Sequence, residues 1–264
     1  YKDGYKLVQA PHLGMEHQSA VAYGNQFKQG YLGRDLSRTG QGLKFDFITI
    51  HESGHEWFGN SITSKDIADM WIHEGFTNYS EALFLESTEG KAAANEYVIG
   101  IQKTISNDIP VIGPYGVNKE GSGDMYPKGA NLIHTIRHII NNHEKFRQIL
   151  RGLNKTFYHK TVTTAEIENY IAKESGLKLD KIFDQYLRHT KIPVLEYKIN
   201  NGTLSYRWLT DVKGFDMPVR VTLKTNEYTL IKPTNDWKTI KVDASVTNEN
   251  FKHDPLFYIA VKKG

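Results

Sequence analysis

The spacing of the apolar residues changes near Ile192, and this change most constrains how the chain can fold. Before it, apolar side chains recur every three to four residues, as on one face of a helix, for example in Lys128 to Asn141. After it, short stretches alternate apolar and polar residues, which is typical of half-buried strands. These stretches are residues 195–199, 204–208, 219–223, 228–231, 239–242 and 257–261. We therefore predict two domains, at residues 1–192 and 193–264.

The first domain is predicted to be mostly helical, and the second to be a small β-sandwich, which gives an α+β fold. Helices are expected at residues 43–58, 70–87, 91–106, 128–141, 144–156, 164–176 and 179–188. Thr164 is the expected N-cap of the sixth helix. A strand is expected at residues 5–10, and loops or connectors at 23–42, 61–69 and 109–123. Asn201-Gly202 predicts a tight hairpin turn between the first two strands of the sandwich.

One motif in the first predicted helix carries chemistry. His51 and His55 are four residues apart, so on a helix their rings lie on the same face, one turn from each other. Two imidazoles placed in this way can share a tetrahedral metal ion, with Glu52 beside them to handle a proton. Glu74 follows after eighteen intervening residues and offers a third ligand. The alternative interpretation, a polar helix face with two incidental histidines, is less consistent with the apolar residues that surround the motif.

Composition limits which metal and which partners the chain can have. The chain has no cysteine, which excludes disulfides and thiolate ligands, so a metal must be bound by histidines and carboxylates. That ligand set suits zinc with an open catalytic position better than a structural zinc. A net charge of +3 without a basic block predicts no nucleic-acid partner. The apolar runs are too short to cross a bilayer and no leader peptide is visible, so we expect a soluble chain of unknown compartment.

Five stretches together resemble the zinc aminopeptidases of the aminopeptidase N and leukotriene hydrolase family, which are gluzincins. They occur in the family's order and cover about residues 5–190. The matching stretches are Gly14-Met-Glu16, His51-Glu-x-x-His55, His55-Glu-Trp-Phe-Gly-Asn60, Trp71-Ile-His-Glu-Gly-Phe76 and Tyr126-Pro-Lys-Gly-Ala130. The resemblance implies a thermolysin-like, mostly helical catalytic domain followed by a β-sandwich domain. Because the chain begins at Tyr1 rather than Met, we also expect further domains of a longer parent protein.

The resemblance implies a zinc-dependent aminopeptidase that hydrolyses the first peptide bond of a peptide with a free N-terminus. One Zn²⁺ per chain would be bound by His51, His55 and Glu74, with a fourth position for water. Glu52 is expected to be the general base, because it lies next to a ligand but cannot easily coordinate the same ion. By resemblance, Tyr126 donates a hydrogen bond to the oxyanion. Most of the 15 tyrosines in such a chain are packing residues, which is the alternative for Tyr126.

Three further residues follow from the same resemblance. Glu16 is expected to pair with the α-ammonium of the substrate, although without the family match an edge-strand glutamate is the simpler interpretation. His17 stands where the family has Asn, and one Gly replaces a Gly-x pair before Met15. At these two positions the pocket for the first residue departs from the family's pattern. Glu81 resembles a glutamate that orients a ligand histidine, or it is a solvated residue of the helix.

Three other functions remain open at the level of the sequence. A zinc endopeptidase of the same class is the alternative if Glu16 does not face the metal. An epoxide hydrolase of the leukotriene type is less consistent with the sequence, because nothing marks a lipid tunnel. A catalytically silent peptide-binding or scaffold module would keep the fold, but the presence of all five residues of the proposed centre argues against it.

Overall fold

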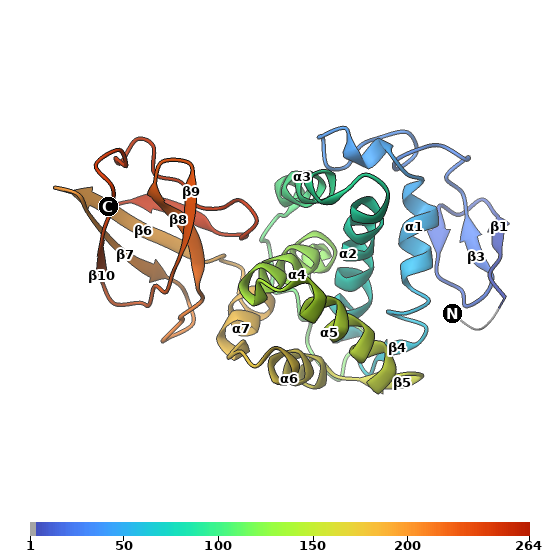
Figure 1. Cartoon of the computed structure of the whole chain (residues 1–264). Coiled ribbons are helices and arrows are strands. Elements are labelled where there is room, and N and C mark those ends of the chain that lie inside the picture. The colour runs from blue at the N-terminus through green and yellow to red at the C-terminus, as the bar shows by residue number, and fades with distance from the viewer. Residues whose placement is uncertain (1–3) are drawn as a thin grey trace.

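The computed structural model has a helical body with a small sheet on one side and a module of strands on the other (Figure 1). The structure describes residues 4–264, so residues 1–3 of the predicted first domain lie outside the described residues. The fold is mixed, with helices up to Arg188 and longer strands from Val194 onward. None of the described helices is long and apolar enough to span a membrane.

Each of the seven predicted helices occurs, with different ends in several cases. They are α1 (Phe47–Gly54), α2 (Trp71–Thr88), α3 (Lys91–Ile101), α4 (Pro127–Ile140), α5 (His143–Thr156), α6 (Thr164–Ser175) and α7 (Asp180–Arg188). Single 3₁₀ turns lie at Gln41–Leu43, Ile67–Asp69, Gln102–Thr104 and Gly123–Met125. The first helix is shorter than predicted, because the Asp46 carboxylate accepts a hydrogen bond from the Thr49 amide and caps α1 at residue 46.

The predicted N-cap of α6 is wrong by one residue. Thr163, not Thr164, is the N-cap: its hydroxyl accepts a hydrogen bond from the Glu166 amide, and the Glu166 carboxylate accepts one from the Thr163 amide, which completes a capping box. Thr164 is instead the first helical residue and is buried, where its hydroxyl accepts a hydrogen bond of 2.7 Å from the Trp71 indole. Adjacent threonines can compete for the cap, and here the burial of Thr164 decides between them.

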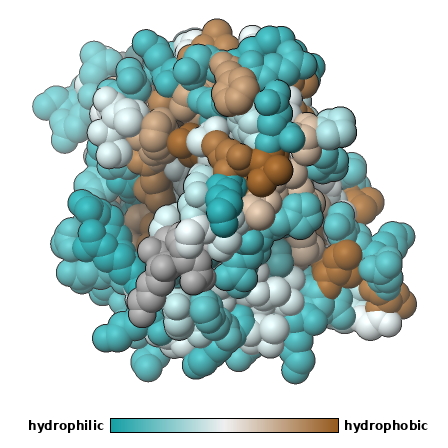
Figure 2. Space-filling model, turned by 90° about the vertical axis from the view of Figure 1, so that its right-hand side faces the viewer, coloured by the Kyte–Doolittle hydropathy of each residue, from teal (hydrophilic) through white to brown (hydrophobic). Residues whose placement is uncertain are grey.

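Short strands bring distant segments of the first domain together. Strands β1 (Leu7–Gln9), β2 (Gly14–Met15) and β3 (Val21–Tyr23) form a sheet in the order β1-β3-β2. Strand β4 (Ile62–Ser64) pairs in parallel with β5 (Lys160–Val162). The prediction of a plain connector at residues 61–69 is therefore wrong, because three residues are too few to show an alternating pattern. The face on the side of β1 and β3 is mostly hydrophilic, with scattered apolar patches (Figure 2).

Six strands form the C-terminal module. They are β6 (Val194–Asn200), β7 (Thr203–Leu209), β8 (Val219–Lys224), β9 (Glu227–Ile231), β10 (Lys238–Lys241) and β11 (Ala260–Lys263). One sheet has the order β10-β7-β6-β11, and β8 pairs with β9 in a second one. Asn201 and Gly202 have positive φ angles of 48° and 68°, as a tight turn between β6 and β7 requires. The last strand begins later than predicted, because Phe257 lies in a turn and packs in the core.

Helix α2 lies at the centre of the helical body, and its close packing against α4 and α1 fixes its position. A Cβ on Gly75 of α2 would lie 3.1 Å from the Gly129 Cα of α4, so the two backbones touch. A Cβ on Gly54 of α1 would lie 3.1 Å from the Thr77 side chain. A glycine within a helix normally lowers its stability, and the close approach of α1 to α2 is a packing reason for Gly54. The three helices are thereby held close to each other beside Glu74.

Candidate metal centre

Helices α1 and α2 place two imidazoles and one carboxylate around a common point. His51 lies in α1 and His55 follows its last residue in a helical conformation, so their rings are one turn apart, with centroids separated by 5.0 Å. The Oε2 atom of Glu74, in the first turn of α2, lies 3.4 Å from His51 Nε2 and 3.3 Å from His55 Nε2. All three side chains are buried. The structure thus brings together the three residues that the sequence motif selected.

The hydrogen bond at the Nδ1 atom of each ring determines whether the Nε2 atom of that ring has a lone pair for a metal ion. The Nδ1 atom of His55 lies 3.0 Å from the Phe58 carbonyl oxygen, which can only accept, so Nδ1 carries the proton. The Nδ1 atom of His51 lies 2.8 Å from Glu81 Oε1 and donates to that carboxylate in the same way. With the proton on Nδ1, the Nε2 atom of His55 carries a lone pair, which faces Glu74 Oε2 at a distance of 3.3 Å.

The Glu74 oxygen between the two rings is the observation that best tests for a metal. Glu74 Oε2 is buried and has no hydrogen-bond partner within the described part of the chain. A buried carboxylate oxygen without a partner is costly, and a cation placed between it and the Nε2 atoms would satisfy all three. The donor set of two nitrogens and one oxygen fits zinc with one open position. These residues therefore fit the ion that the sequence implied.

The pKa values of Glu74 and His51 are both shifted by the interaction between these side chains. Burial alone would raise the pKa of Glu74, but the interactions with His51 and His55 outweigh it and lower that pKa to about 2. Burial alone would lower the pKa of His51, but Glu74 and Glu81 together raise it to about 10. The two opposite shifts show that the charges of His51 and Glu74 stabilise each other across 3.4 Å.

A second layer of side chains holds His51 in position. Glu81 is fully buried, so the alternative of a solvated helix residue is wrong. Its Oε2 atom accepts a hydrogen bond of 2.7 Å from the Asn78 amide and another from the Tyr97 hydroxyl. Sequence reasoning missed both donors. Asn78 lies one turn after Glu74 and faces Glu81, so helical spacing contained a signal, whereas no spacing rule links Tyr97 on α3 to this site.

Glu52 lies in the wall of a cavity next to the three ligand residues. Burial raises the pKa of its carboxyl group, as do the charges of Glu16 and Glu74, and the two histidines oppose this shift. A Cβ on Gly14 of β2 would lie 2.3 Å from Glu52 Oε1, so any larger residue there would displace this carboxylate from its position. The cavity has a volume of about 540 Å³, and His51, Glu52 and Tyr126 all line it.

Tyr126 and Glu16 reach the same site from other elements, and His17 does not. Tyr126 caps α4, its ring centroid lies 5.9 Å from that of His51, and burial together with Glu74 raises the pKa of its hydroxyl. The hydroxyl therefore stays protonated and can donate. Glu16 follows β2, and its carboxylate lies within 4.8 Å of ligand atoms of Glu52 and His55. His17 is exposed, and among the described residues no hydrogen bond joins its ring to the site.

His73 illustrates that proximity in the sequence does not make a ligand. Although it precedes Glu74, its Nε2 atom accepts a hydrogen bond of 2.7 Å from the Ser64 amide at the end of β4. The ring is buried, and burial lowers its pKa. His73 therefore fastens α2 to β4.

The sequence of this chain is similar to those of known peptidases. The model of the peptidase family M1 domain matches residues 7–186. A glutamyl aminopeptidase of Bitis rhinoceros is 25% identical over 183 residues, which cover 63% of this chain and 18% of that protein. An aminopeptidase N of Lactococcus lactis subsp. lactis is 24% identical over 218 residues, which cover 76% of this chain and 26% of that protein. The chain thus spans about a fifth to a quarter of these curated relatives.

The fold itself is similar to that of a solved structure. The crystal structure of an M1 zinc metallopeptidase from Deinococcus radiodurans matches with a TM-score of 0.55 and 20% sequence identity. The match covers 71% of this chain and 39% of that chain. At this identity the similarity concerns the fold, and the chemistry of the site has to be argued from its own residues.

Proposed function

This chain belongs to peptidase family M1, and from that membership and the geometry of the site we propose that it is a zinc-dependent aminopeptidase. The observation that carries the proposal is the unpartnered Glu74 oxygen, which faces the Nε2 atoms of His51 and His55. The substrate would be a peptide with a free N-terminus, and the reaction would be hydrolysis of its first peptide bond.

In this proposal His51, His55 and Glu74 hold one zinc ion per chain. When bound, the ion supplies a water of lowered pKa and polarises the scissile carbonyl. Glu81 positions His51 by accepting a hydrogen bond from Nδ1–H, and the Phe58 carbonyl does the same for His55. Both rings then present a lone pair, which a zinc ligand requires.

Glu52 would act as the general base and then as the general acid. Its carboxylate accepts a proton from the attacking water and later gives that proton to the departing amine, so that the residue returns to its starting state. A raised carboxyl pKa suits this exchange, because a stronger base accepts the proton more readily. The contact with Gly14 limits where the carboxylate can move.

Tyr126 would bind the carbonyl oxygen of the scissile bond, and Glu16 would bind the α-ammonium of the first residue. The protonated Tyr126 hydroxyl can donate a hydrogen bond to the oxyanion that forms at the carbonyl. The Glu16 carboxylate, close to Glu52 and His55, can pair with the α-ammonium of the first residue. This placement of Glu16 favours an aminopeptidase over an endopeptidase. His17 is exposed, and we propose that its ring contacts the substrate only after it moves towards the site.

The domain organisation is part of the same proposal. Residues 1–192 would form a thermolysin-like catalytic domain and residues 193–264 a β-sandwich domain. The end of α7 at Arg188 and the start of β6 at Val194 support a boundary at this place. The greater length of the relatives supports further domains in a longer parent protein.

The proposal is tested by zinc content together with the choice of substrate. We expect about one zinc per chain and hydrolysis of aminoacyl-anilides, with little cleavage of the same residues in N-acetylated peptides. A chain that binds no zinc would overturn the whole proposal. Equal cleavage of blocked and free substrates would instead indicate the endopeptidase.

The role of Glu16 is tested in the same assay. Glu16→Ala should lower the rate on free aminoacyl-anilides while leaving zinc content unchanged, because Glu16 is not proposed as a ligand. Glu174→Ala, at an exposed position on α6, is the matched control and should behave as the unchanged chain. An unchanged rate for Glu16→Ala would remove its anchoring role.

A further inference from the structure

A second cavity lies between α2, α4 and α5, away from the candidate metal centre. Its volume is about 510 Å³, and its lining comes from the last turns of α2, from Arg137 of α4 and from α5, which packs beside α4 (Figure 1). On α2 the lining begins at Leu83 and ends at Ser87. At the rise of an α-helix these positions lie about 14–20 Å beyond Glu74, so the cavity is separate from the proposed zinc ligands.

The floor of this cavity is apolar and consists of Leu83, Phe146 and Leu150. Phe146 is buried, and its ring meets the Tyr79 ring of α2 edge to face with centroids 6.0 Å apart. Leu83 and Leu150 are partly buried and pack against the same core. These side chains are held in place by the helices, and a ligand that covers them gains free energy by removing apolar surface from water.

The buried charges beside this floor already neutralise each other. The Nη1 and Nη2 atoms of Arg137 donate hydrogen bonds of 2.6 Å and 2.7 Å to the two oxygens of Glu86, and Nη1 also donates to the Tyr79 hydroxyl over 3.1 Å. The hydrogen bond from Arg137 lowers the pKa of Glu86, so this carboxylate stays ionised and keeps its partner. Arg137 and Glu86 therefore form the wall of the cavity and leave little charge for a ligand.

The rim of the cavity, in contrast, carries two cations without a counterion. Arg147 and Arg151 of α5 are exposed and line the cavity, and within the described part of the chain neither side chain has a hydrogen bond or an ion pair. They are four residues apart, so they lie on one face of the helix, where like charges repel each other. Glu144, one turn before Arg147, bonds instead to Gln148, whose Nε2 atom donates to its Oε1 atom over 3.3 Å.

We propose that this cavity binds an organic carboxylate that carries an aromatic or aliphatic group. The carboxylate pairs with the guanidinium groups of Arg147 and Arg151, whose planar donors match two oxygens, and the apolar group covers the floor. The volume is that of a cavity for a small ligand. A free acid and the C-terminal residue of a peptide share this chemistry. The site involves neither zinc nor hydrolysis, so it does not depend on the function proposed above.

A titration followed by nuclear magnetic resonance tests where the ligand binds. In the chain labelled with ¹⁵N-arginine, phenylpropionate should shift the signals of Arg147 and Arg151, which the single variants to Gln assign. Acetate lacks the ring and phenylpropionamide lacks the charge, so each should bind at least about tenfold more weakly. Shifts that leave out both arginines, as binding at the metal centre would give, or equal affinities for the three compounds would overturn the proposal.

Removal of one charge from the rim should weaken binding. Arg147→Gln and Arg151→Gln should each lower the affinity for phenylpropionate at least about threefold, because each loses one charged partner of the carboxylate. Lys155→Gln is the matched control, since Lys155 is an exposed cation one turn further along α5 and does not line the cavity. Equal losses in the three variants would show that only the overall charge matters and would contradict the site.

A negative charge added on the α2 side tests the same geometry without removing an arginine. Ser87 is exposed and lines the cavity, so the carboxylate of Ser87→Glu would compete with the ligand for the rim and should weaken binding at least about threefold. Thr88→Glu is the control, because Thr88 is also exposed but does not line the cavity. Equal affinities in these two variants would contradict the proposed position of the carboxylate.

A blocked peptide identifies the source of the carboxylate. Acetyl-Gly-Gly-Phe has no free N-terminus, and its C-terminal amide has the same apolar side chain without the charge. Binding of the peptide acid but not of the amide would identify a peptide C-terminus as the ligand, and binding of phenylpropionate alone would identify a small acid. Equal affinities for the peptide acid and its amide, with the same shifts of Arg147 and Arg151, would overturn the role of the carboxylate.

Discussion

At the scale of single residues, the properties of the candidate centre come from the atoms behind the ligands. Glu81 and the Phe58 carbonyl each accept a hydrogen bond from the Nδ1–H group of one histidine, which leaves both Nε2 atoms facing Glu74. Asn78 and Tyr97 hold Glu81 in turn. Because these partners are buried, the rings cannot turn away to bond with water, and the centre is preorganised for a cation.

The variant Glu52→Gln tests whether Glu52 is the general base or a metal ligand. Glutamine has nearly the same shape but cannot accept the proton, so we expect the rate of hydrolysis to fall by about 10²–10⁴-fold while zinc stays near one per chain. Aminoacyl-anilide hydrolysis and metal analysis of the same sample provide the two values. A variant that loses its zinc would show that Glu52 is a ligand and that the assignment is wrong.

At the scale of elements, the crossing of α2 and α4 sets the distance between Glu74 and Tyr126. Glu74 precedes Gly75 in α2, and Tyr126 caps α4 one turn before Gly129. A Cβ on Gly129 would lie 2.9 Å from the Gly75 Cα, and backbone atoms cannot turn aside as a flexible side chain can. The two glycines therefore act as spacers for the site without touching it.

Gly129→Ala should destabilise the chain although alanine favours helices. Forcing the two backbones apart is expected to cost about 1–3 kcal/mol, against a gain of about 1 kcal/mol in helix propensity. Urea unfolding of the metal-free chain would measure the net loss. Gly123→Ala is the control, since a Cβ there meets nothing within 4 Å and should change stability by less than about 0.5 kcal/mol. An unchanged midpoint for Gly129→Ala would contradict the close crossing.

The sequence predicted elements well where they are long and periodic, and poorly where they are short. All seven helices were expected, and long ones such as α4 repeat their apolar positions over several turns. Strand β4 was missed because its three residues show no period and its partner β5 lies about a hundred residues later. The proximity of His51, His55 and Glu74 could be predicted from spacing within one helix and from the resemblance. The contact between Tyr97 and Glu81 could not, because it depends on how α3 packs on α2.

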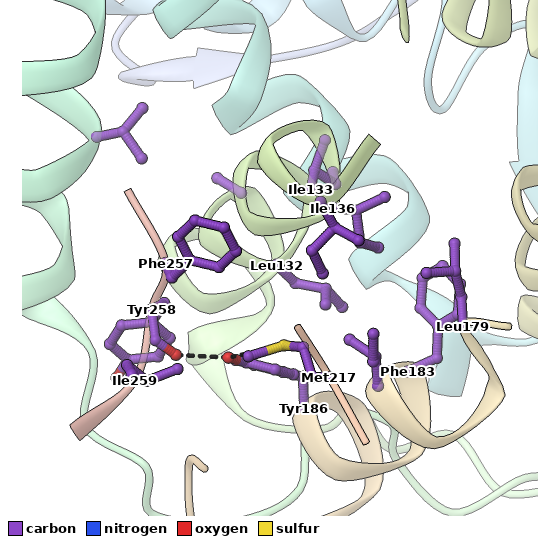
Figure 3. Packing of buried hydrophobic residues seen from close by; sticks show 14 of the residues in the cluster. Leu132, Ile133, Ile136, Leu179, Phe183, Tyr186, Met217, Phe257, Tyr258 and Ile259 are labelled. Atoms are coloured by element: carbon purple, nitrogen blue, oxygen red, sulfur yellow. Dashed lines mark hydrogen bonds between the residues drawn. The ribbon is translucent and has the colours of Figure 1, made fainter. Parts of the chain in front are cut away.

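At the scale of the whole molecule, the strand module is joined to the helical body by a buried core and by polar contacts. Tyr186 of α7 donates a hydrogen bond of 2.5 Å to the Tyr258 carbonyl, and both residues belong to the buried cluster that also includes Leu132 and Ile136 of α4 (Figure 3). Arg220 of β8 donates to His138 Nδ1 of α4 over 2.9 Å, and its Nε atom lies 3.3 Å from Asp254. The two parts therefore form one packed body.

His138 should make this junction sensitive to acid. Burial lowers its pKa to about 3, with the positive charges of Arg220 and Arg137 acting in the same direction. Between pH 6.5 and 3 the unfolded chain binds the proton and the folded chain does not, so stability falls as the pH falls through this range. From pH 7 to pH 5 the loss attributable to His138 should reach about 2 kcal/mol.

Replacement of this ring tests that pH dependence. His138→Gln keeps an acceptor for Arg220 but cannot titrate, so it should lose less stability than the unchanged chain between pH 7 and pH 5. Urea midpoints at the two pH values give the difference, and His12→Gln, at an exposed position, is the control. An equal loss in His138→Gln and in the unchanged chain would show that His138 does not carry the effect.

The central claim is that His51, His55 and Glu74 hold a catalytic zinc, and the position of the ion tests it most directly. Anomalous diffraction at the zinc edge from zinc-loaded crystals should show one strong peak, about 2.0–2.2 Å from the Nε2 atoms of both histidines and from a Glu74 oxygen. The fourth position should be open to the cavity that Glu52 lines. A peak elsewhere, or no peak between these three side chains, would contradict the account.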